Sequence, residues 1–161
     1  MNPMLADIFL WAYAVMLGIL TGGALFERLV LVSVWDSSPP DSVRNWNSDP
    51  RNALDPPGKF FKFVTPPVML LMLVMFYIGF KSDYPFRCWL LTSASLVLVV
   101  IVSTLTYFAP NMEALTLRHG EGLDSETIVR KTRLWVSLQY IRLFVLILGW
   151  LAALQAFRIH G

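Results

Sequence analysis

Four long apolar segments dominate this sequence, and the third of them, residues 89–108, carries no charged residue. The other three run from about residue 8 to 35, from about 60 to 80 and from about 134 to 157. A helix needs about 20 mostly apolar residues to cross the roughly 30 Å hydrocarbon core of a bilayer. A soluble helical bundle would instead need polar outer faces at helical spacing, which the third segment lacks. The sequence therefore predicts an all-α, four-helix transmembrane bundle with up-and-down topology.

The composition agrees with a single membrane domain spanning residues 1–161. Hydrophobic residues make up 56% of the chain and charged residues 15%, whereas ordinary soluble domains hold about 45–50% and 25%. The first apolar segment follows no basic region and is too long for a cleaved signal peptide, so it is predicted to remain as the first span. Two polar stretches, 36–59 and 109–133, form long connections, and residues 81–88 form a short hairpin.

Lysine and arginine are distributed unevenly between the two sides of the predicted bundle. Eight lie in or beside the long connections, namely Arg44, Arg51, Lys59, Lys62, Arg118, Arg130, Lys131 and Arg133. The opposite side holds three, namely Lys81, Arg87 and Arg158. Because cytoplasmic loops are enriched in Lys and Arg, both long connections are predicted to be cytoplasmic and both termini extracytoplasmic, in the cell (inner) membrane.

Two ionisable side chains fall at the same predicted depth inside the membrane. Glu27 lies eight residues before Trp35, at the end of the first span, and Arg142 lies eight residues after Leu134, at the start of the fourth. At 1.5 Å per residue, both lie about 12 Å below the same surface. Because an unpaired charge there is costly, the two are predicted to contact each other or to share one ligand. Two interpretations remain open, a structural clamp that orients the helices and a binding or catalytic pair.

Other polar residues are predicted to gather near this pair. Trp135, Gln139 and Arg142 follow one another at i, i+4 and i+7, so they share one helix face. The third span places hydroxyl groups, among them Thr104 and Tyr107, toward the same end. The opposite half of the bundle is nearly pure hydrocarbon by sequence. A pocket opening toward the cytoplasmic half is therefore expected.

The first span contains glycines at a spacing that favours close helix packing. Gly18 and Gly22 are four residues apart, with Thr21 and Gly23 beside them. Small residues at this spacing let a second helix approach closely in a membrane. The segment is therefore predicted to be a helix–helix contact.

The sequence lacks the patterns of metal, nucleotide and nucleic-acid sites. His119 and His160 have no second histidine at ligand spacing, and Cys88 is the only cysteine. There is no Gly-rich nucleotide loop. The formal charge of +2, without a Lys/Arg run, does not suggest a nucleic-acid partner. No metal and no cofactor are predicted, so any chemistry would run on a carboxylate, a guanidinium, tyrosines and the substrate's own reactivity.

Three places in the sequence resemble the anthrone-oxygenase-like family of small four-helix membrane proteins. They are the run Ala109-Pro110-Asn111-Met112-Glu113-Ala114-Leu115, the pattern Arg133-Leu134-Trp135 with Gln139-Tyr140-Ile141-Arg142, and the segment Thr65-Pro66-Pro67. Trp135 and Arg142 match the family pattern outright. Gln139 and Tyr140 stand where the family has an Asn-His pair, and the asparagine after the proline is shifted to Asn111.

The resemblance implies oxygenation of an electron-rich polycyclic phenol such as an anthrone, without metal or flavin. The leading hypothesis is therefore an oxidoreductase that binds a lipophilic aromatic or quinone-like molecule. Its catalytic residues would be Glu27 as base and Arg142 as stabiliser of the enolate or phenolate. The substrate-binding side chains would be Trp135, Gln139, Tyr140, Asn111, Tyr107 and Arg28.

Two other functions remain open. The chain could be a non-enzymatic accessory subunit that packs in a larger membrane complex, or a homo-oligomer. It could also be a carrier for a small lipophile, which needs a pocket and no base. An accessory subunit co-purifies with partners, whereas an enzyme is folded alone or as a homo-oligomer.

Overall fold

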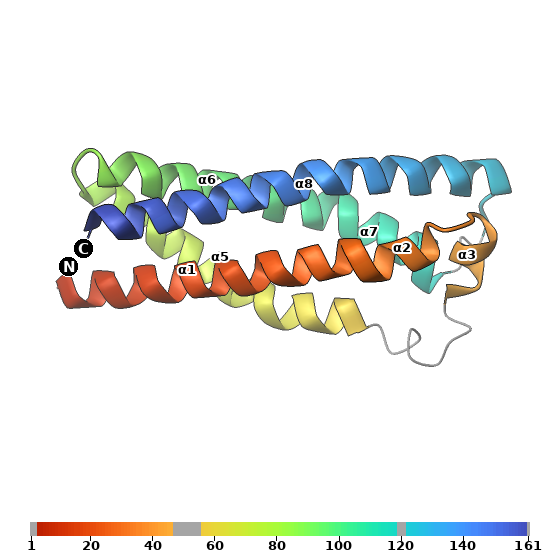
Figure 1. Cartoon of the computed structure of the whole chain (residues 1–161), viewed down its shortest axis with the longest axis horizontal. Helices are drawn as coiled ribbons and strands as arrows, with labels where there is room; N and C mark the ends of the chain where they lie inside the picture. The colour runs from red at the N-terminus through yellow and green to blue at the C-terminus, as the bar shows by residue number, and fades with distance from the viewer. Residues whose placement is uncertain (1–2, 47–55, 119–121, 161) are drawn as a thin grey trace.

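The computed structural model describes residues 3–46, 56–118 and 122–160 and, over those ranges, is helical without a strand (Figure 1). The first helix is continuous through α1 (Pro3–Phe26), the π-helical segment η1 (Glu27–Leu31) and α2 (Val32–Trp35). The second is α5 (Pro56–Lys81). The third runs through α6 (Phe86–Ser103), η3 (Thr104–Phe108), α7 (Ala109–Met112) and η4 (Glu113–Leu117). The fourth is α8 (Ser125–His160), and the short helix α3 (Asp41–Arg44) lies in the first connection.

The helices alternate in direction, which confirms the predicted up-and-down bundle. Both termini and the α5–α6 turn lie at one end of the molecule, which we call the terminal end (Figure 1). The connection holding α3 and the start of α8 lie at the other, which we call the loop end (Figure 1). Each long helix packs against the next along the chain, and α8 returns to pack against α1, so the bundle is closed.

All four long helices are long and apolar enough to span a membrane, and the candidate spans lie within Met4–Trp35, Gly58–Lys81, Phe86–Thr116 and Ser125–Ile159. Many outward-facing side chains of these helices are large and apolar, as their buried side chains are. Phe63 is 79% exposed and Leu70 is 65% exposed on α5, and α8 presents Phe144 in the same way. Large apolar side chains pointing away from a bundle are stable only in a nonpolar surrounding. The chain is therefore an integral, multi-pass membrane protein.

The third and fourth helices continue beyond the apolar segments that predicted them. The third continues to Leu117, and α8 begins at Ser125 instead of near residue 134. Asp124 caps α8, because its Oδ2 accepts a hydrogen bond of 3.1 Å from the backbone N–H of Thr127. The connection therefore has fewer irregular residues than 109–133. Leu115 and Ile128, one in each extension, are buried, so one face of each extension packs inward.

Those inward faces build a second apolar core. The larger membrane core joins all four helices and includes Leu10, Leu17, Val68, Met75, Leu90, Val97 and Ala153. The second, which we call the loop-end cluster, consists of Val32, Trp35, Val43, Trp46, Phe108, Leu115, Ile128, Trp135 and Val136. Val43 and Trp46 belong to the first connection, so its described part, residues 36–46, packs against the loop end of the bundle.

Tyr13 and Ser93 correct the expectation that the terminal half is nearly pure hydrocarbon. The two hydroxyl oxygens lie 3.2 Å apart in the buried core, and Ser93 donates a hydrogen bond of 2.7 Å to the Gly149 carbonyl. Trp150 also donates from Nε1 to the Ala14 carbonyl, at 3.0 Å. A lone Tyr or Ser in an apolar segment looks innocuous in sequence, and only the packing pairs them.

The predicted glycine motif is only partly a packing contact. A Cβ added at Gly18 would lie 3.2 Å from the Trp150 ring, and one at Gly23 would lie 2.2 Å from the Phe60 ring. A Cβ at Gly22 would meet nothing within 4 Å. The close contacts are therefore made by Gly18 and Gly23, because those two face the bundle whereas Gly22 faces outward.

Candidate functional site

A buried ion pair joins the first and fourth helices. The Glu27 carboxylate Oε2 lies 3.1 Å from the Arg142 guanidinium Nη2, and the side chains are 4% and 10% exposed. The predicted contact between these residues is therefore present. Neither charged group points toward lipid, so the electrostatic interaction is screened little by solvent.

Two further polar side chains complete this layer. Gln139 donates from Nε2 to the same Glu27 oxygen at 3.0 Å, and Arg142 Nη1 donates to Thr104 Oγ1 at 3.3 Å. The Thr104 hydroxyl in turn donates to the Val100 carbonyl at 2.7 Å. We call Glu27, Thr104, Gln139 and Arg142 the polar layer. It takes side chains from the first, third and fourth helices.

Two members of the polar layer begin π-helical segments. Glu27 opens η1 and Thr104 opens η3, and each accepts a backbone hydrogen bond from the fifth residue along the chain, Val32 and Ala109 respectively. Such widened turns occur mostly as isolated bulges and frequently at functional sites. Pro110 cannot donate a backbone hydrogen bond, so it is a local sequence signal for the irregularity in the third helix. The first helix carries no comparable signal.

The polar layer lies between the two apolar cores. Along α8 it occupies positions between Trp135, in the loop-end cluster, and Leu143, in the membrane core. Burying two charges costs several kcal/mol per ion, and the geometry must restore what hydration supplied. Here the guanidinium has an anion and a hydroxyl as partners, and the carboxylate oxygen has two donors.

Aromatic rings cover the loop-end side of the polar layer. The Arg142 Cζ lies 4.4 Å from the centroid of the Phe108 ring, within the range of a cation–π interaction. Trp135 packs edge-to-face on Phe108 and on Trp35, with centroids 5.6 and 5.2 Å apart. Its indole N–H donates to the Phe108 carbonyl at 3.1 Å. Trp135 was predicted from its helix face, whereas Phe108 and Trp35 had the appearance of ordinary span-end aromatics.

Gln139 has one polar atom without a partner. The side chain is fully buried, and its Oε1 accepts no hydrogen bond from any group in the described part of the chain. Its amide orientation follows from Glu27, because a carboxylate oxygen requires the N–H₂ side. A buried acceptor without a donor costs about 1–3 kcal/mol. Oε1 is therefore the group beside the ion pair that a donor from a bound molecule would satisfy.

The other predicted binding residues do not join the polar layer. Arg28 donates to the Tyr140 hydroxyl and stacks over its ring at 4.3 Å, on an outward side where Tyr140 is 55% exposed. Asn111 donates only to the Tyr107 carbonyl, at 2.8 Å, one turn back on the same helix. The motifs and the position along the chain that suggested these residues do not show in which direction each side chain points around its helix axis.

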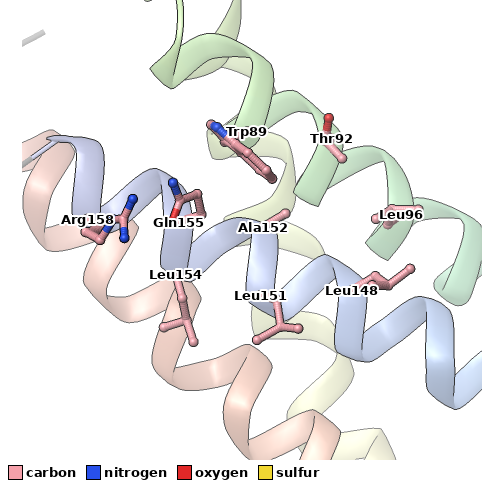
Figure 2. Close-up of a pocket in the computed structure, with 9 residues that line it drawn as sticks. All are labelled: Trp89, Thr92, Leu96, Leu148, Leu151, Ala152, Leu154, Gln155 and Arg158. Carbon is pink, nitrogen blue, oxygen red and sulfur yellow. The ribbon is translucent and has the colours of Figure 1, made fainter.

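A groove of about 630 Å³ lies elsewhere, at the terminal end between α6 and α8 (Figure 2). Its innermost residue on α8 is Leu148, six residues beyond Arg142. The polar layer contributes none of the residues that line it. The groove and the ion pair are therefore separate features.

Within residues 3–46, 56–118 and 122–160, no group of three or more His, Cys, Asp or Glu side chains is arranged to hold a metal ion. Comparison of the whole chain with protein-family models, with curated proteins and with solved structures gives no match. The functional assignment therefore depends on the geometry of the polar layer and on the motifs in the sequence.

Proposed function

We propose that this integral membrane protein is an oxidoreductase of the anthrone-oxygenase type, acting on a lipophilic aromatic or quinone-like substrate at the polar layer. Three observations support the proposal. A carboxylate and a guanidinium are buried together, an aromatic surface formed by Phe108 and Trp135 adjoins them, and a buried amide oxygen beside them lacks a donor.

The free Oε1 of Gln139 carries the proposal. A purely structural clamp uses the hydrogen bond from the Gln139 amide to Glu27, but it gives no reason for the amide oxygen to be buried without a donor. A phenolic substrate has an O–H that would donate to this oxygen. The same amide would then hold the carboxylate and the substrate in one geometry, which favours reaction by fixing the distance between them.

The chemistry follows from the two charges. Glu27 would remove a proton from the acidic CH₂ of an anthrone-like ring, and Arg142 would stabilise the resulting enolate. The electron-rich enolate reacts with molecular oxygen. Overall the CH₂ becomes C=O, with one oxygen atom of O₂ entering the product and the other leaving as water. Trp135 and Phe108 would stack on the ring, since aromatic surfaces prefer offset or edge contacts with it.

The second candidate is a non-enzymatic accessory subunit of a larger membrane complex. The near-complete burial of Glu27 and Arg142 favours it, because a saturated ion pair holds two helices in register without any ligand. The two candidates differ in what the purified protein does. An accessory subunit co-purifies with partner proteins, whereas the proposed enzyme consumes substrate and oxygen alone.

The test is oxygen uptake by the purified protein with an anthrone, and with a quinol as a second substrate. We expect wild type to convert the anthrone to the anthraquinone, and the folded double variant Glu27→Gln/Arg142→Gln to be inactive. Gln139→Leu should raise KM and also lower kcat, because it removes both the substrate contact and the hydrogen bond that positions the Glu27 carboxylate. A monodisperse wild-type protein without turnover, or full turnover in the double variant, would contradict the proposal and favour the accessory subunit.

A further inference from the structure

The groove between α6 and α8 changes in character along its length (Figure 2). At the terminal end it is lined by Trp89, Gln155 and Arg158, which carry polar tips. Farther in, its walls are apolar and include Leu96 and Leu148. A volume of about 630 Å³ is in the range of small-molecule sites, which span about 300–1,000 Å³.

The polar groups at the mouth have free hydrogen-bonding capacity. Within the described ranges, no carboxylate pairs with Arg158, and neither the Trp89 indole nor the Gln155 amide bonds to another residue. They therefore present a positive charge and N–H donors at one place. Donors and a cation without an anion in the protein are complementary to a phosphate group.

The length of the groove matches one leaflet of a bilayer. Arg158 and Leu148 are ten residues apart on α8, which is about 15 Å along the helix axis. Half of the roughly 30 Å hydrocarbon core is also about 15 Å. A helix of a second membrane protein would cross both leaflets, whereas this groove ends near the middle. A single acyl chain, entering from the headgroup region, fits that length.

We infer that this groove is a binding site for one anionic diacyl phospholipid, with the phosphate at Arg158 and an acyl chain between α6 and α8. The indole N–H of Trp89 and the amide of Gln155 donate to the phosphate or to the ester oxygens. Trp side chains are suited to this depth, because their rings are apolar and their N–H remains at the interface. The site is independent of the polar layer and of the proposed reaction.

Native mass spectrometry of the detergent-purified full chain tests the inference. The protein is mixed with equal amounts of phosphatidylglycerol and phosphatidylcholine that have the same palmitoyl and oleoyl chains. We expect wild type to retain one phospholipid with a preference for phosphatidylglycerol. Arg158→Gln should reduce this preference about fivefold, since one cation near the surface gives an effect of that order.

Matched variants separate the groove from general effects. Thr92→Trp fills the groove from an exposed position and should reduce retention of both lipids, whereas Leu98→Trp, on the same helix outside the groove, should not. Arg130→Gln removes a charge near the other end of α8 and should leave the preference unchanged. Equal retention of the two lipids by wild type, or equal retention by Thr92→Trp and Leu98→Trp, overturns the inference. A wild-type dimer that Thr92→Trp dissociates also overturns it, because the groove would then hold a second copy.

Discussion

The carboxylate of Glu27 and the guanidinium of Arg142 lie 3.1 Å apart, although the two residues are 115 positions apart in the sequence. Both belong to helices whose other buried contacts are mainly apolar. Each charge therefore depends on the other, because the neutral side chains of Gln139 and Thr104 hydrogen-bond to the pair but supply no counter-charge. The pair joins the first and last helices of the bundle, so it also closes the ring of four spans.

Neutralising one partner should be more damaging than neutralising both. We expect Glu27→Gln or Arg142→Gln alone to reduce the free energy of unfolding by about 3–5 kcal/mol, since each leaves an uncompensated buried charge. The double variant should recover most of that loss. Unfolding in detergent, monitored by circular dichroism, measures the coupling. Losses that simply add in the double variant would show that the two side chains act independently.

Gly22 and Gly23 are adjacent and should respond oppositely to alanine. A Cβ at Gly23 would lie 2.2 Å from the ring of Phe60, which is 36% exposed, so Gly23→Ala should displace that ring and destabilise by about 1 kcal/mol, the low end of overpacking costs. Gly22→Ala meets open space and should be neutral, or stabilising by up to about 1 kcal/mol through better helix propensity. Melting temperatures of the two variants in one detergent provide the comparison. Equal destabilisation would contradict the packing of Phe60 on Gly23.

The buried Tyr13–Ser93 hydrogen bond should show an asymmetry. Ser93 donates its proton to the Gly149 carbonyl, so Tyr13 donates to Ser93. Tyr13→Phe removes one donor and should cost about 1 kcal/mol, whereas Ser93→Ala leaves a buried phenol unpaired and should cost about 1–3 kcal/mol. The double variant should be less destabilised than the sum of the two single variants. A greater loss from Tyr13→Phe than from Ser93→Ala would contradict this direction of donation.

The orientation predicted from Lys and Arg places the loop end in the cytoplasm. Asn45 is exposed in the first connection and Asp83 is exposed in the α5–α6 turn, at opposite ends of the bundle. In a Cys88→Ser background, we expect an impermeant thiol reagent added to intact cells to label Asp83→Cys and not Asn45→Cys. Labelling should reach Asn45→Cys once the membrane is permeabilised. The reverse pattern in intact cells would invert the topology.

Two aspartates outside the spans should make opposite contributions to pH dependence. Burial raises the pKa of Asp36, against the opposing effect of Arg28 and Arg133, so this group adds stability as the pH falls through its folded-state pKa. The hydrogen bonds from Thr127 hold the pKa of Asp124 below its ordinary 3.8, so its contribution is present above 3.8 and is lost as the pH falls through the lower value. Melting temperatures measured between pH 3 and 7 check both signs. In Asp36→Asn the protein should no longer gain the stability that protonation of Asp36 adds at low pH. In Asp124→Asn it should no longer lose the stability that protonation of Asp124 removes at low pH. Unchanged profiles would contradict both assignments.

The sequence by itself determined the number of candidate spans, their alternation and the matching positions of Glu27 and Arg142 along their helices. These properties vary only along the helix axis, where 1.5 Å per residue converts position into depth. Hydropathy identified all four helices for the same reason, because a bilayer selects on length and apolarity. The face shared by Trp135, Gln139 and Arg142 also followed from helical spacing.

The tertiary structure decided what varies around the axis and between helices. It separated Gln139, beside the ion pair, from its neighbour Tyr140, which faces outward with Arg28. The π-helical segments at Glu27 and Thr104 shift the register of two helices there, and Glu27 had no local signal for it. The sequence also did not predict that Val43 and Trp46 belong to the loop-end cluster, because a polar loop has no helical period from which buried positions can be identified. Side-chain direction, helix register and loop packing all depend on contacts between segments that are distant in the sequence. Close packing of the whole bundle determines those contacts, and no local run of residues does.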